Sequence, residues 1–230
     1  MSEENRITEL AMRLMEDWQA GREPTGLARD DAYAIASGLH FEMDQRTGAR
    51  AHHAAEQGLP IACEEGCSGC CENLVMVFKG EAVAIAQWLS EPGNESERAW
   101  FLESYAGWRE RVGDAPDRAE AAQRAGDAAG YARAVLSAWQ ERVMCAFNRD
   151  NRCTVYPVRP NACRNCHALH TADRCQASFG QPPETLPFQP IQDFRLGVRP
   201  LSQAVHVALG GDPEVTVAVC QQVFEYLQQS

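Results

Sequence analysis

This sequence has almost no lysine, and it lacks both long apolar runs and an excess of positive charge. Lys79 is the single lysine, which excludes a P-loop and a catalytic lysine at any other position. No run of 18 or more apolar residues exists to span a bilayer. The net charge of −11 disfavours phosphate-rich partners, which bind basic surfaces. We therefore predict neither a nucleic-acid partner nor a membrane partner.

The first twenty residues carry acidic and basic side chains throughout, so they leave no apolar core for a secretory signal. We therefore expect a cytoplasmic protein, in which thiols stay reduced and clustered cysteines bind metal. The even count of ten cysteines also permits disulfides, but no export signal accompanies it. Hydrophobic residues make up 45% of the chain and charged residues 23%, as in a soluble globular protein.

Apolar residues recur at helical spacing over most of the chain. We predict a mostly α protein: residues 1–230 form a single helical domain, with flanking helices in 4–58 and 200–228. Two irregular cysteine-rich loops would converge on a metal centre within a module spanning about 63–175. One long helix is expected over Ala115–Phe147, delivering Cys145 at its end. A last helix is expected to open at Asp212 and Pro213, a capping residue followed by proline.

Nine of the ten cysteines fall in two segments and are the candidate metal ligands. Small residues separate the thiols of the first segment, which lets the backbone curl tightly. One tetrahedral zinc uses four ligands, so nine thiols indicate either two mononuclear sites or a polynuclear centre such as an iron–sulfur cluster. The first segment contains Cys63, Cys67, Cys70 and Cys71, and the second contains Cys145, Cys153, Cys163, Cys166 and Cys175.

The adjacent thiols of Cys70 and Cys71 are expected to diverge, because neighbouring side chains point apart in most backbone conformations. One would then bind the main centre, and the other would serve a second ion or redox chemistry, or simply be buried. Cys220 lies on one helical face with Val219, Val223 and Phe224, so we expect a buried structural thiol there.

These residues resemble the CxxCxxCC family of zinc- or iron-chelating proteins, the YkgJ-type cysteine cluster proteins. The first cysteine segment, with Glu81 after it, is similar to the family's opening block. The second block is similar through Tyr156, the pair Arg159-Pro160 and the pair Cys163-Arg164. The first spacing departs from the family pattern, with three residues between Cys63 and Cys67 instead of two.

The resemblance implies eight ligands, which here would be Cys63, Cys67, Cys70, Cys71, Cys145, Cys153, Cys163 and one further thiol. Cys175 fits that last place, and Cys166 is an extra thiol that competes with it. Flagellin lysine methylases carry a similar cysteine block, so the resemblance implies a metal module but no particular reaction.

Basic side chains are concentrated in the second cysteine segment, which contains five arginines and only two aspartates. Four thiolates on a divalent ion leave a site with negative charge, which guanidinium groups stabilise. Arg159 and Arg164, fixed beside Pro160 and Cys163, are the two for which we predict this cofactor-supporting role. His167 and His170 stand at ligand-like spacing after Cys163 and Cys166, and their ligation stays open.

The sequence thus predicts a metal-binding protein whose multi-cysteine centre holds zinc or iron, with an iron–sulfur cluster slightly favoured. Its role would be structural, delivery or redox. The alternative is an enzyme or enzyme subunit whose iron–sulfur centre takes part in electron transfer or methyl transfer. No dinucleotide fingerprint, nucleophile elbow or zinc-protease helix accompanies the cysteines, so no catalytic residue is assigned. The metal, its nuclearity, the oligomeric state and any protein partner stay open.

Overall fold

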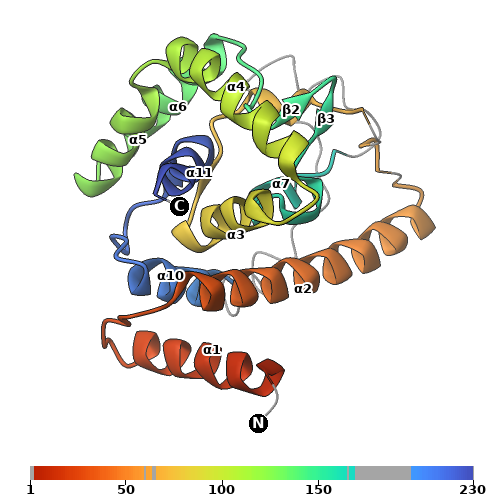
Figure 1. Ribbon diagram of the computed structural model, residues 1–230. Coiled ribbons are helices and arrows are strands. Elements are labelled where there is room, and N and C mark those ends of the chain that lie inside the picture. Colours follow the sequence, from red (N-terminus) through yellow and green to blue (C-terminus); the bar gives the residue numbers. More distant parts are fainter. Residues whose placement is uncertain (1–2, 60, 64–65, 165, 169–197, 230) are drawn as a thin grey trace.

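The computed structural model describes residues 3–59, 61–63, 66–164, 166–168 and 198–229, which are mostly helical (Figure 1). Near the N-terminus, α1 (Glu3–Gln19) lies beside the long helix α2 (Arg29–Glu56). Helix α10 (Arg199–Ala208) packs against α1 from the far end of the sequence. Helices α1 and α2 together cover most of the range 4–58 in which flanking helices are predicted.

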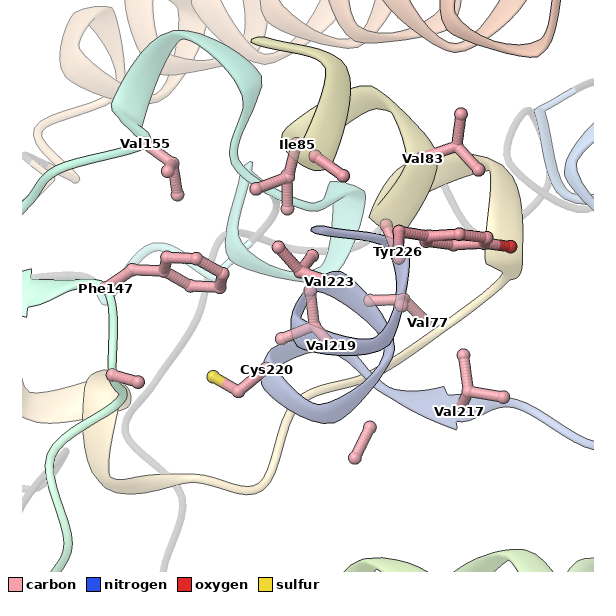
Figure 2. Packing of buried hydrophobic residues seen from close by; sticks show 14 of the residues in the cluster. Val77, Val83, Ile85, Phe147, Val155, Val217, Val219, Cys220, Val223 and Tyr226 are labelled. Atoms are coloured by element: carbon pink, nitrogen blue, oxygen red, sulfur yellow. The ribbon is translucent and has the colours of Figure 1, made fainter. Parts of the chain in front are cut away.

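The short helix α3 (Lys79–Ser90) occupies the centre of the protein. It packs against α2, α10, α4 (Glu95–Val112) and α11 (Val219–Gln228). A helix surrounded in this way buries apolar residues on every side rather than on one stripe. Figure 2 shows Ile85 of α3 pointing toward Val223 of α11, whereas the Val83 side chain points away from α11. The buried positions of α3 include Ala82, Val83, Ala84, Ile85, Ala86 and Leu89.

Two strands join the beginnings of α3 and α11. Strand β1 (Met76–Val77) pairs antiparallel with β4 (Val217–Ala218), with Met76 opposite Ala218 and Val77 opposite Val217. Each strand runs directly into its helix. The pairing therefore places the first turn of α11 close to the chain that follows the first cysteine segment.

The long helix predicted over Ala115–Phe147 is wrong. The chain forms two packed helices, α5 (Ala115–Arg124) and α6 (Ala128–Gln140), separated by a turn. Gly126 adopts a φ of +65° there, and the Asp127 carboxylate then accepts a hydrogen bond from the Gly130 N–H as the cap of α6. Because α6 ends at Gln140, Cys145 lies in irregular chain beyond it.

The helix predicted to open at Asp212 and Pro213 is also wrong. The Asp212 side chain accepts a hydrogen bond from the Glu214 N–H at 3.0 Å, which closes a local turn instead of starting a helix. The chain then becomes extended through β4, and α11 begins only at Val219. Pairing with β1 therefore prevails over a strong local helix-start signal.

Helix α10 crosses α3 closely, since a Cβ added at Gly80 would lie 2.6 Å from Cγ1 of Val205. The next residue, His206, is buried and bridges two chain segments. Its Nδ1 accepts a hydrogen bond from the Lys79 N–H, and its Nε2 donates to the Asp212 carbonyl, both at 2.9 Å. The ring is therefore neutral, with its proton on Nε2, and it satisfies the first N–H of α3.

One hydrophobic core runs from Leu14 in α1 to Leu227 in α11, which confirms a single helical domain for the described residues. None of the described helices is both long enough and apolar enough to cross a bilayer.

Burial lowers the pKa of His206, which gives a testable pH dependence. Its pKa in the folded protein lies below the 6.5 of an exposed histidine, so its stabilisation is complete above pH 6.5 and is lost as the pH falls below that value. His206→Gln should lower the free energy of unfolding by about 1–3 kcal/mol at pH 7.5, because buried hydrogen bonds are lost. Denaturant unfolding should also show a smaller stability loss between pH 7.5 and pH 5.5 in the variant.

The matched control is His52→Gln on the exposed surface of α2, which should keep the wild-type pH profile. An unchanged pH dependence in His206→Gln would contradict the neutral bridging role of this ring.

Candidate metal centre

The first cysteine segment follows α2 and ends in a tight turn. Gly66 takes a φ of +91°, a conformation that suits glycine. The chain then enters a 3₁₀ turn, η1 (Gly69–Glu72), in which the Cys71 N–H donates to the Ser68 carbonyl at 2.8 Å. This turn carries Cys70 and Cys71 together.

The second segment is held by α4 and by a short hairpin. Ser104 of α4 donates to the Ala146 carbonyl at 2.6 Å, and Phe101 stacks on Phe147 with ring centroids 4.4 Å apart. Strands β2 (Asn148–Arg149) and β3 (Arg152–Cys153) then pair across a two-residue turn whose φ angles are both positive. These contacts fix Cys145 just before the hairpin and Cys153 at its far end.

Hydrogen bonds place the two cysteine segments side by side. The Ala62 N–H donates to the Ala168 carbonyl at 2.8 Å, and the Ala168 N–H donates to the Cys63 sulfur at 3.2 Å. At the other end, the Cys145 N–H donates to the Cys71 carbonyl at 2.7 Å. Segments far apart in the sequence are therefore in direct contact at both ends.

Thiol–thiol interactions link cysteines of the two segments. Hydrogen bonds from Cys166 and Cys71 lower the pKa of Cys70, and the nearby Arg159 charge acts in the same direction. Cys70 is thus the thiol of the adjacent pair that ionises first, while the pKa of Cys71 is raised by the same hydrogen bond and by burial. The two adjacent thiols therefore interact with each other, and which of them would bind the main centre stays a prediction.

Burial raises the pKa of Cys63, Cys153 and Cys163, and neighbouring thiolate charges raise it further. The charges of Cys145 and Cys70 each raise the pKa of both Cys153 and Cys163. Cys67 interacts with Cys63. The candidate ligands of the described chain therefore form one connected set of thiols.

This set is not arranged as a preformed metal site. Among the described residues, no three or more cysteine, histidine, aspartate or glutamate side chains are grouped so that they could hold a metal ion. Cys175 and His170, both named as candidates, lie outside the described residues. His167 is described, and its pKa is lowered by burial first and by the Arg159 charge next.

Arg164 is the most deeply buried charged group beside the thiols, with only 1% of its surface exposed. Its guanidinium pairs with Asp44 of α2 and donates to the Arg159 and Pro157 carbonyls. These bonds hold the turn that contains η2 (Tyr156–Val158) and α7 (Asn161–Arg164) against α2. Arg164 therefore fixes the chain around Cys163.

Arg159 faces the thiols from the same turn. Its guanidinium lies 4.0 Å from the ring centroid of Tyr156, a cation–π contact. Its positive charge lowers the pKa of Cys70 and of Cys153, though larger causes dominate in each. Of the two predicted arginines, Arg159 thus acts electrostatically on two of the thiols, while Arg164 organises the backbone.

Two residues next to the thiols were not assigned roles there by the sequence. Glu81 of α3 is buried, which raises its pKa to about 7, and it accepts hydrogen bonds from the backbone and side chain of Asn161 at the start of α7. Cys220 is buried as predicted, but its sulfur lies 3.7 Å from that of Cys145. Nothing in the local sequence indicates either contact, since both depend on how distant helices pack.

Comparisons of the chain with models of known protein families, with curated proteins and with solved structures find no match. The resemblance to the CxxCxxCC family therefore rests on the residues named above.

Replacing Arg164 should destabilise the whole domain. Arg164→Met keeps the apolar stem but leaves two buried carbonyl acceptors without their donor, each costing about 1–3 kcal/mol. We expect the free energy of unfolding, measured by denaturant titration, to fall by about 3 kcal/mol. Arg118→Met, which removes an exposed ion pair with Asp114, should cost less than about 1 kcal/mol. Equal effects of the two substitutions would refute the anchoring role.

Proposed function

We propose that this chain is a metal-binding protein whose multi-cysteine centre binds zinc or iron, the latter alone or in an iron–sulfur cluster. The observation that carries the proposal is the contact between the two cysteine segments. Backbone hydrogen bonds from Ala62 and Cys145 join them, and thiols from both segments interact within one connected set. Bringing thiols from two distant segments together is the arrangement that a shared metal centre requires.

The donor set fits these metals. Thiolates are soft ligands that suit zinc and iron–sulfur clusters, whereas magnesium and calcium prefer oxygen. The described thiols outnumber the four ligands of one tetrahedral ion, so the centre would hold a second ion or a cluster. When bound, the metal would supply the charge that allows several neighbouring thiols to ionise at once.

The protein side of the centre supports the same function. Arg159 lies beside Cys70, where a guanidinium would offset the negative charge of a thiolate-bound metal. Arg164 and Glu81 hold the turn that carries Cys163. These groups would orient ligands rather than bind the metal themselves.

Exposure differs across the thiol set, and this favours a delivery or redox role over a purely structural one. Cys166 is exposed, while Cys70 and Cys163 are covered to a greater degree. A solvent-facing thiol gives an incoming protein or small ligand a first point of exchange with the centre.

The first test is anaerobic purification followed by metal, sulfide and absorption analysis. A brown protein with acid-labile sulfide would identify an iron–sulfur cluster, and a colourless protein with stoichiometric zinc would identify mononuclear sites. Perturbation of the metal spectrum by an exogenous ligand would favour the enzyme alternative, because it requires an open coordination position. A folded protein that binds none of these metals under reducing conditions would overturn the proposal.

The second test asks whether the two segments share one centre. Cys67→Ala and Cys163→Ala should each remove metal from the same site and lower the melting temperature by similar amounts, because metal binding energy is folding energy when the ligands come from distant segments. The double variant should be little worse than either single variant. Metal content and thermal unfolding check both points.

Arg159→Ala is the comparison variant. It keeps every ligand and should weaken metal retention by about 10- to 100-fold, as loss of an outer-shell group does. If the two cysteine variants each lose a separate portion of metal and their destabilisations add, the segments hold independent sites.

A further inference from the structure

Cys145 and Cys220 form a close pair of thiols that the sequence did not connect. Their sulfurs lie 3.7 Å apart, although the residues are separated by 75 positions. Cys145 is partly buried and belongs to the second cysteine segment, whereas Cys220 is only 2% exposed and lies in the first turn of α11.

The Cys220 side chain points out of its helix toward the second cysteine segment. In Figure 2 its sulfur projects toward the chain that carries Phe147, away from Val223 and Val217. Cys145 lies two positions before Phe147 on that same chain. The thiol of Cys220 therefore faces the candidate centre from inside the core.

Backbone hydrogen bonds fix both partners to one neighbouring segment. The Cys145 N–H donates to the Cys71 carbonyl at 2.7 Å, and the Val219 N–H donates to the Val75 carbonyl at 3.0 Å. Cys71 lies within η1, and Val75 directly precedes β1, four residues later. The Cys145–Cys220 separation thus follows from the fold rather than from a flexible side chain alone.

The sulfur–sulfur distance matches two ligands of one ion. Zinc–thiolate bonds are about 2.3 Å long, so two thiolates on a regular tetrahedron are separated by about 3.8 Å. Cysteines bound to different irons of a cluster are held farther apart, because the irons lie between them.

We propose that Cys220 binds the same tetrahedral metal ion as Cys145, on the buried side of the centre. This inference rests on the proposed metal-binding function and replaces the purely structural role expected for Cys220. The site would hold a single metal ion, or the ion would be one iron of a two-iron cluster. Cys71, Cys153 and Cys163, whose thiols interact with Cys145, are the candidates for the remaining positions.

Cobalt(II) binding to the purified, reduced chain tests the proposal by spectroscopy. Cys220→Ser should lower the thiolate-to-cobalt charge-transfer absorption of one site by about a quarter, because that site loses one of four thiolates. The variant should also lose cobalt to a chelator more readily than the wild type. Loss of an outer-shell group typically weakens metal binding by about 10- to 100-fold, and loss of a ligand should weaken it more.

Val223→Ala is the matched control for packing. Val223 is fully buried on the same helix, so its truncation disturbs the core without removing a thiol. The cobalt spectrum of this variant should equal that of the wild type. A Cys220→Ser variant with an unchanged spectrum and unchanged retention would overturn the role of Cys220 while leaving the metal-binding function intact.

A measurement on the wild-type chain avoids any dependence on how the variants fold. In the protein loaded with ¹¹³Cd, scalar coupling should connect the β-protons of Cys145 and Cys220 to the same cadmium resonance. Coupling of Cys145 without Cys220 would overturn this inference alone. Failure of the wild-type chain to bind cobalt or cadmium would instead overturn the proposed function.

Discussion

The buried guanidinium of Arg164 is the interaction on which the local structure of the cysteine-rich module most depends. A charge removed from water is costly unless it is paired and hydrogen-bonded. Here Asp44 supplies the opposite charge from α2, and two carbonyls of the preceding turn accept the remaining hydrogen bonds. The same bonds set the backbone path from Pro157 to Cys163. One side chain therefore holds the backbone of Arg159 and of the turn that carries Cys163.

The cost of ionising many thiols in a small volume is the second constraint. Burial and neighbouring thiolates raise the pKa of Cys153 and Cys163, so without a cation most of this set would stay protonated. Arg159 offsets only part of that charge. A bound divalent ion would reduce the repulsion, and it would add a direct link between the two segments. Metal binding and local folding would then be coupled through the same thiols.

How far the sequence predicted this protein depends on the range over which each signal acts. Gly21 and the apolar spacing from Ile7 to Trp18 are local, and α1 follows from them. The Ala115–Phe147 prediction failed because apolar spacing continues across Gly126, whose positive φ breaks the helix. The helix start predicted at Asp212 is wrong for the opposite reason. The local signal is strong, but the chain that follows pairs as a strand with Met76 and Val77.

The candidate site likewise contains features that follow from local sequence and features that depend on distant contacts. Spacing within each segment identified the thiols, because ligands close in sequence have a recognisable pattern. The roles of Glu81 and Arg164 depend on contacts with α7 and α2, which no local pattern contains. The sequence predicts Arg164 as a group that supports the metal centre, which stays a prediction, and its guanidinium also holds the backbone through two carbonyls.

The paired cysteines Cys70 and Cys71 connect two parts of the thiol set that differ in exposure. Cys70 interacts with the exposed Cys166, while Cys71 is joined through Cys145 to the buried Cys220. Exchange of a metal with a partner requires a thiol that solvent can reach, and firm retention requires thiols that it cannot reach. A centre built across this turn would combine both properties, with labile coordination at the Cys166 end and inert coordination at the Cys220 end. The fold supports that division because the outer thiols lie on irregular chain and the innermost lies in a helix packed against α3.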